Sequence, residues 1–189
     1  MKLMLDTTTG RLIRCQPDKH EWIKAHAMVG TRTNIVTSIE VTEGDRNDSP
    51  ELPALLASTT QRFDVAEVSA DKGYLSHKNL DAIAAAGAAA YVPFKANSQG
   101  SGPETWQRLW HLFWYKKQEF LSHYHQRSNV ETTFSMIKRK LGGSVRSKLY
   151  TAQVNEVLCK VLAHNLMVLV HEMFELGIEP TFWSEKAVA

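Results

Sequence analysis

The sequence has very little cysteine and no long apolar run, and its acids are unevenly distributed along the chain. Cys15 and Cys159 are the two cysteines, and they form neither a CxxC pair nor a disulfide framework, so a reducing, cytoplasmic environment is expected. The most apolar run, LMVLV at 166–170, is far shorter than the roughly 20 apolar residues that a membrane span needs. Walker-type, G-x-S-x-G and G-x-G-x-x-G motifs are missing, which leaves NTPase, esterase and dinucleotide-binding functions without support.

Charge is nearly balanced over the whole chain but divided along it. Residues 39–71 hold eight acids and two bases, whereas residues 115–150 hold eight bases and two acids. Such a division is typical of a polyanion-binding surface beside an acidic region that is either solvated or metal-binding. Within the basic half, the stretch HYHQRSNVETTFSMIKRKLGG (123–143) keeps a single acid, Glu131.

The order of predicted elements indicates an α/β fold. NIVTSIEV (34–41) and FDVAEVSAD (63–71) are strand-like, and residues 76–87 form a helix that begins at Ser76 and ends at Gly87. A further strand at 88–95 completes a βαβ unit, so part of the sheet should be parallel. NSQGSGPE (97–104) is the expected flexible linker to C-terminal helices, roughly 123–141 and 152–176.

On a single helix over 123–141, two stripes appear. Val130, Phe134, Ile137 and Leu141 form the predicted buried face, and Tyr124, Arg127, Glu131 and Lys138 form a column beside it. Two interpretations of Glu131 stay open from the residues alone. It is either half of a solvated Arg127–Glu131 pair, or one ligand of a Mg²⁺ site that needs further carboxylates.

Two other acids are suitably placed for such a site. Asp6 is predicted to end the first strand and Asp71 ends the strand 63–71. If these strands are neighbours, both carboxylates meet at the carboxyl edge of the sheet, where ligands of α/β proteins collect. Either aspartate could instead be an ordinary turn or cap residue.

Four of these residues spell Y-x2-R-x3-E-x6-K, which resembles the signature of DDE transposases of bacterial insertion sequences. WIKAHAMVGTRTNIVTSIEV, ADKGYLSHKNL and QVNEVLCKVLAHNLMVLVHEMFELG resemble the central hairpin, the second-Asp segment and the closing helix of that family. The resemblance covers nearly the whole chain. It implies one RNase H-like domain over residues 1–189, a mixed sheet flanked by helices with further C-terminal helices.

The resemblance also implies a function. Asp6, Asp71 and Glu131 would be the catalytic acids and the ligands of two Mg²⁺ or Mn²⁺ ions, and Tyr124, Arg127 and Lys138 would contact DNA. Lys116 and Lys117 are added as further candidate phosphate contacts. The reactions expected are metal-dependent DNA cleavage and strand transfer at insertion-sequence ends, by a homodimer in the cytoplasm, associated with the nucleoid and not with a membrane.

Two departures from the family pattern leave alternatives open. LDTTTG favours Asp6 as the first acid, yet TTTGRLIRC also resembles a segment that lies beyond that acid in relatives; Asp18 and Asp45 are poorer choices. The chain also starts only five residues before Asp6, so truncation at the N-terminus is expected. The alternatives are therefore an inactive transposase remnant that only binds DNA, or an RNase H-like nuclease without end specificity.

Overall fold

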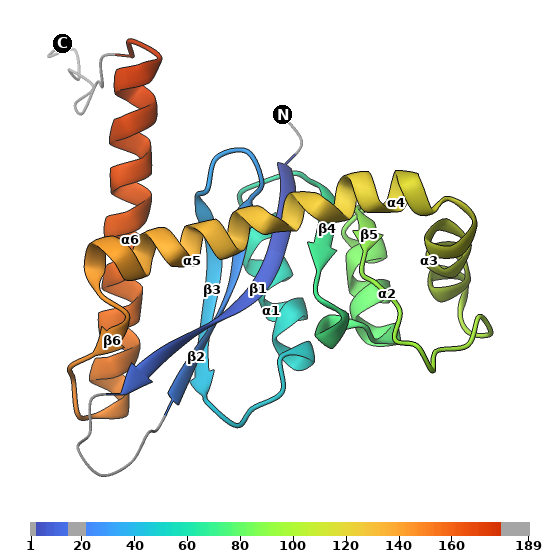
Figure 1. Cartoon of the computed structure of the whole chain (residues 1–189), viewed down its shortest axis with the longest axis horizontal. Coiled ribbons are helices and arrows are strands. Elements are labelled where there is room, and N and C mark those ends of the chain that lie inside the picture. Colours follow the sequence, from blue (N-terminus) through green and yellow to red (C-terminus); the bar gives the residue numbers. More distant parts are fainter. Residues whose placement is uncertain (1–2, 15–21, 179–189) are drawn as a thin grey trace, which may run out of the picture.

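The computed structural model describes residues 3–14 and 22–178, with side chains described from Ile23 onward. Its sheet runs in the order β3-β2-β1-β4-β5, and the short β6 also pairs with β1 (Figure 1). The strands are β1 (Leu3–Arg14), β2 (Trp22–Gly30), β3 (Val36–Glu43), β4 (Val65–Ala70), β5 (Ala89–Tyr91) and β6 (Ser144–Val145). The predicted mixed α/β sheet is confirmed, because β1, β2 and β3 are antiparallel whereas β4 and β5 continue the sheet in parallel with β1.

Helices cover both faces of this sheet. They are α1 (Leu52–Thr60), α2 (His77–Ala85), α3 (Glu104–Tyr115), α4 (Lys117–Tyr124), α5 (Ser128–Leu141) and α6 (Tyr150–Glu175), with 3₁₀ turns at Ser49–Glu51, Lys72–Tyr74 and His125–Arg127. Residues on β2 alternate between two cores, as the period of two of a strand requires. Ile23, Ala25, Ala27 and Val29 pack with α5 and α6, whereas Met28 packs with α1 and α2 on the other face.

The helix predicted over residues 123–141 is in fact divided. Tyr124 ends α4, residues 125–127 form a 3₁₀ turn, and α5 begins at Ser128. The backbone stays right-handed and helical throughout the junction, so the turn tightens the path without reversing it. The buried stripe is confirmed for Val130, Phe134 and Ile137, while Leu141 is only half-buried.

The prediction that Asp6 ends the first strand is wrong. β1 continues for eight residues beyond it, to Arg14, and pairs with β2 along this length. The physical reason is pairing with β2, which continues to Ile13, and the β-branched run Thr7–Thr9 favours the extended conformation within it. Asp6 therefore lies inside a strand.

Local signals place the remaining elements near their predicted positions. The Ser76 hydroxyl accepts a hydrogen bond from the Asn79 amide (3.2 Å) and so caps α2, and Gly87 ends the segment with φ +72°, a conformation that glycine adopts without strain. Residues 92–103 join β5 to α3 and include most of the predicted linker. Trp106 Nε1 donates to the Gln99 carbonyl (2.8 Å), which ties this loop to the start of α3.

Candidate active site

Asp71 follows the last residue of β4, at the start of the turn Lys72–Tyr74. Its carbonyl accepts a hydrogen bond from the Tyr74 amide (2.8 Å). Tyr74 is buried, and its own carbonyl accepts a hydrogen bond from the Asn79 side-chain amide (2.7 Å). The backbone that carries Asp71 is therefore fixed from both sides, while its carboxylate faces partly into solvent.

Glu131 lies in the first turn of α5, and its side chain is exposed. Val130 and Phe134, next to it in the helix, are buried against the sheet and set the rotation of α5. Asn129 donates to the Thr31 carbonyl and Thr133 contacts Asn34 (3.3 Å), so polar contacts with the β2–β3 turn hold the same end of the helix.

Arg127 brings these two acids together. Its Nη1 lies 2.9 Å from Asp71 Oδ1, and its Nη2 lies 3.3 Å from Glu131 Oε1. The guanidinium carbon stands 5.4 Å from the centre of the Tyr124 ring, and the Arg127 side chain is only 20% exposed. Two carboxylates 60 residues apart in the sequence thus share one planar cation, over which an aromatic ring is placed.

The backbone of Asp6 lies close to this cluster. In the parallel pairing of β1 with β4, Asp6 is aligned with Ser69 and Thr7 with Ala70, so Asp6 is two positions before Asp71 in strand register. The side chain of Asp6 lies outside the described part of the structure, as does all of Asp18. Asp45 is exposed in the loop after β3, which agrees with its turn-like sequence context.

The predicted lysine contacts lie farther along the helices. Lys138 is exposed and sits seven residues after Glu131 on α5, or about 10 Å along the axis at the usual rise per residue. Lys116 pairs with Glu119 (3.3 Å), and Lys117 is exposed at the start of α4. Lys116 and Lys117 lie at the end of α4 away from Tyr124, and Lys138 lies in the last turn of α5.

A contact between His123 and Glu67 beside the site was missed from the sequence. His123 Nδ1 lies 2.6 Å from Glu67 Oε2, and the His123 ring stacks on Tyr91 with centres 4.4 Å apart. Burial and the charges of Glu67 and Glu119 raise the pKa of Tyr91. The sequence feature that could have revealed Glu67 is the alternation of side chains along a strand, which places Glu67, Ser69 and Asp71 on one side of the sheet.

Lys24 and His26 lie on the face of β2 that points away from α5, and they contact the loop that follows β3. Lys24 Nζ donates to the Arg46 carbonyl (2.6 Å) and to Asp48 (3.2 Å). His26 is fully buried, with its ring nitrogens 3.2 Å from Tyr74 Oη and 2.9 Å from Thr42 Oγ1. Burial lowers the pKa of His26, against the opposing influence of Asp48 and Glu51.

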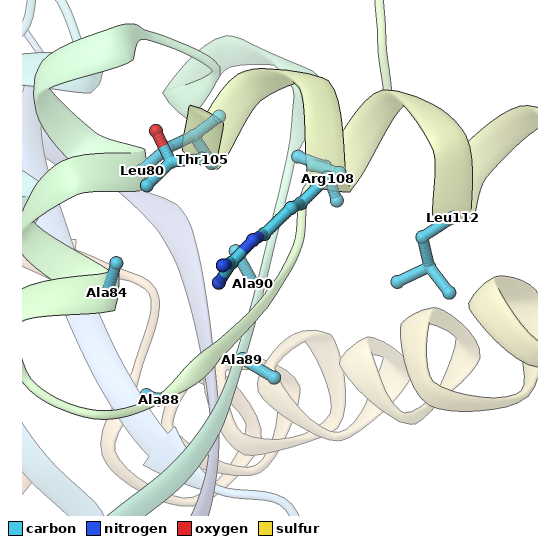
Figure 2. A pocket seen from close by; sticks show the side chains of 9 residues that line it. Leu80, Ala84, Ala88, Ala89, Ala90, Thr105, Arg108 and Leu112 are labelled. Atoms are coloured by element: carbon cyan, nitrogen blue, oxygen red, sulfur yellow. The ribbon is translucent and has the colours of Figure 1, made fainter. Parts of the chain in front are cut away.

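Among the described side chains, no three His, Cys, Asp or Glu residues form a metal-binding group, and Asp6 falls outside that set. Asp71 and Glu131 nevertheless suit a hard cation, because they already share one positive charge between them. A cavity of about 270 Å³ lies elsewhere, between α2, β5 and α3 (Figure 2). Its lining is mostly alanine and leucine with Arg108 across it, and it includes none of the candidate acids.

Comparison with known proteins identifies the family. The family described as "Transposase DDE domain" matches residues 7–166. The chain belongs to this family. The predicted membership of the DDE transposases, a family of nucleases and polynucleotidyl transferases, is thereby confirmed.

Other comparisons add little to the family match. Curated proteins give no significant match to the transposase domain. The BIV integrase catalytic core is similar at 10% identity and TM-score 0.36, over 85% of this chain and 99% of that one. The simian T-cell lymphotropic virus intasome in complex with PP2A regulatory subunit B56 gamma is similar at 13% identity and TM-score 0.38, over 77% of this chain and 50% of that one.

Among the described residues, one helix, α6, is long and apolar enough to cross a membrane by length and composition alone. The short apolar run noted in the sequence therefore belongs to a longer apolar helix. Its inner face packs on the sheet, as is common for a helix of a globular domain.

Proposed function

We propose that this transposase domain performs metal-dependent DNA strand cleavage and strand transfer at insertion-sequence ends. The observation that carries the proposal is the convergence of Asp71 and Glu131 on Arg127. A site of this kind joins two anionic ligands for a divalent cation to a group that binds phosphate.

Asp71 and Glu131 would hold Mg²⁺ or Mn²⁺, with Asp6 as the third acid and two ions in the complete site. The bound ions would supply charge neutralisation and a lowered pKa of the attacking hydroxyl group. In the first step water attacks a phosphodiester, the P–O3′ bond breaks, and a free 3′-hydroxyl and a 5′-phosphate result. In the second step that 3′-hydroxyl attacks a phosphodiester of target DNA, and the 3′-oxygen of the target strand leaves.

Arg127 would change partners during this cycle. Without DNA it neutralises both acids, and on DNA binding its planar guanidinium would turn to a phosphate oxygen, for which its geometry suits two parallel hydrogen bonds. Tyr124 would support the guanidinium through its ring and could stack on an unpaired base. Lys138, Lys116 and Lys117 would bind the DNA backbone on either side.

The test is nicking of supercoiled plasmid in Mg²⁺ or Mn²⁺. Nicking by the wild type that is lost in Asp71→Asn and in Glu131→Gln, and kept in the exposed-surface control Glu104→Gln, supports the proposal. DNA that carries element ends should be cleaved in preference to random DNA. Equal cleavage of both would favour an RNase H-like nuclease without end specificity.

A second candidate function is a DNA-binding remnant without catalysis. It is favoured by the ion pairs of Arg127 with Asp71 and Glu131, because a metal ion has to displace at least one of them before it binds. Such a protein would shift DNA in a gel through its basic helices and would leave plasmid intact. For the active protein we propose a homodimer, because strand transfer joins two element ends.

A further inference from the structure

The segment from Phe120 to Val130 connects α4 to α5 and carries Tyr124 and Arg127 of the candidate site. The two helices follow one another across the sheet (Figure 1). Phe120 and Val130 are fully buried, whereas residues 121–129 are each half-buried or exposed. Within this described part of the chain, neither the 3₁₀ turn between the helices nor α5 has a side-chain hydrogen bond at its N-cap. Burial is therefore complete only at the two ends of the segment, and its middle depends on partial packing and polar contacts.

His123 lies in the last turn of α4 and contacts both β4 and β5. Its Nδ1 is 2.6 Å from Glu67 Oε2, and its backbone carbonyl accepts a hydrogen bond from the Ser69 hydroxyl (3.4 Å). Its ring lies nearly parallel to that of Tyr91, with 6° between the planes and 4.4 Å between the centres. Because an ionised carboxylate only accepts hydrogen bonds, the His123 Nδ1 carries the proton in its contact with Glu67. One residue of α4 is thus held by two strands of the sheet.

The contact between His123 and Glu67 is also partly withdrawn from solvent. The two side chains are 29% and 21% exposed, whereas Lys116 and Glu119, which pair within α4, are 65% and 51% exposed. Exposed pairs contribute little because water and salt screen them, and a hydrogen bond to a carboxylate is stronger where the surroundings are less polar. The contact of His123 therefore joins α4 to β4 at a place where it contributes more than an exposed pair does.

A short series of contacts leads from His123 to the candidate acids. Tyr124 follows His123 at the end of α4, and the Arg127 guanidinium carbon lies 5.4 Å from the centre of its ring. Arg127 in turn reaches Asp71, which directly follows β4 and shares its side of the sheet with Glu67. The strand that carries one acid of the site therefore also holds the helix end from which the bridging cation extends.

We propose that Glu67 and His123 are positioning residues, which hold the end of α4 on β4 and thereby set the place of Arg127 between the two acids. They act through the helix junction and take no part in the chemistry. The role requires a hydrogen-bond acceptor on residue 67 and not a charge, because an amide oxygen can accept from the His123 Nδ1 as a carboxylate does. Its consequence for catalysis rests on the proposed function, whereas its consequence for the junction does not.

Hydrogen–deuterium exchange followed by mass spectrometry tests the junction without metal or DNA. In Glu67→Ala, peptides within residues 121–131 should exchange about fivefold faster or more, while peptides of α6 keep the wild-type rate, because only local opening becomes easier. Glu67→Gln should exchange like the wild type. Asp64→Ala and Ser122→Ala are the controls, since both residues are exposed, one just before β4 and the other next to His123. Unchanged exchange in Glu67→Ala overturns the inference, and so does faster exchange over the whole domain, which would be a loss of general stability.

Nicking of plasmid at saturating DNA tests the catalytic consequence. We expect the rate constant of Glu67→Ala to fall by about tenfold or more, because displaced catalytic groups lose rate steeply, and that of Glu67→Gln to stay within about twofold of the wild type. Nicking by Glu67→Ala at the wild-type rate, with a loosened junction, overturns the positioning role. Equal loss in Glu67→Ala and Glu67→Gln overturns it as well, because it assigns the charge of Glu67 to the chemistry. A wild type that does not nick contradicts the proposed function, and the exchange pattern then decides the inference alone.

Discussion

Arg127 Nη1 lies 2.9 Å from Asp71 Oδ1, across a sequence separation of 56 residues. The same guanidinium reaches Glu131, so one side chain joins the end of β4 to the first turn of α5. In a metal-free site this cation offsets the repulsion between the two acids. It also sets the condition for metal binding, which must weaken at least one of the two ion pairs.

We expect Arg127→Ala to weaken binding to DNA of any sequence and to reduce the salt dependence of binding. Loss of one phosphate contact should lower the slope of log K against log salt by about 1. Fluorescence anisotropy with a labelled duplex at several salt concentrations measures this slope. Arg139→Ala is the control, since Arg139 is exposed on α5 and lies off the column of Glu131; equal slopes for wild type and Arg127→Ala would exclude a phosphate contact.

The same substitution should have the opposite effect on metal affinity. Removing the guanidinium frees Asp71 and Glu131 to bind a cation without first breaking an ion pair, so Mn²⁺ should bind Arg127→Ala more tightly than the wild type. Isothermal titration calorimetry without DNA measures this affinity. Weaker Mn²⁺ binding by Arg127→Ala would mean that Arg127 holds the acids in place for the metal and does not compete with it.

The stability of the domain should fall as the pH is lowered from 7.5 to 5.5, in part through His26. Burial lowers the pKa of His26 below its usual 6.5, so the unfolded chain binds a proton more readily than the folded one as the pH falls through 6.5. The free energy of unfolding therefore decreases over this range and levels off below the folded pKa. Urea unfolding at several pH values should show a flatter dependence for His26→Gln, whereas His171→Gln, at an exposed position, should keep the wild-type slope.

Asn79→Ala should destabilise the fold by about 1–3 kcal/mol, because it leaves buried acceptors unpaired. The Asn79 amide donates to Ser49 and to the Tyr74 carbonyl, and so connects the loop before α1 to the turn that follows Asp71. Chemical unfolding gives the change in free energy. Asn47→Ala, in the exposed part of the same loop, should change it little; similar losses in both variants would remove the special role of Asn79.

The strand after Asn34, the start of the helix at Ser76 and the buried stripe of α5 could be predicted from the sequence because each depends on a local pattern. The β-branched run at 36–41, the Ser76 cap and the spacing of Val130, Phe134 and Ile137 all act within one element. Family resemblance then supplied the pairing of distant parts. The adjacency of Asp71 and Glu131 was expected from the family resemblance and as a condition of metal binding, since nothing local links β4 to α5.

What could not be predicted depends on tertiary context. The 3₁₀ turn at His125–Arg127 interrupts a sequence whose apolar period fits one continuous helix, and it occurs where Ser69 and Glu67 of β4 contact His123. The extension of β1 past Asp6 depends on pairing with β2. The bridging position of Arg127 could be recognised only after Asp71 and Glu131 were both located. The spacing of Arg127 and Glu131 alone also fits an ordinary i,i+4 ion pair on a helix surface.

The most direct test is a crystal of the domain soaked in Mn²⁺, with anomalous scattering measured at the manganese edge. We predict a peak within bonding distance of both the Asp71 and the Glu131 carboxylates, with the Arg127 guanidinium displaced from at least one of them. No peak near either carboxylate at millimolar Mn²⁺, with both ion pairs to Arg127 intact, would contradict the account.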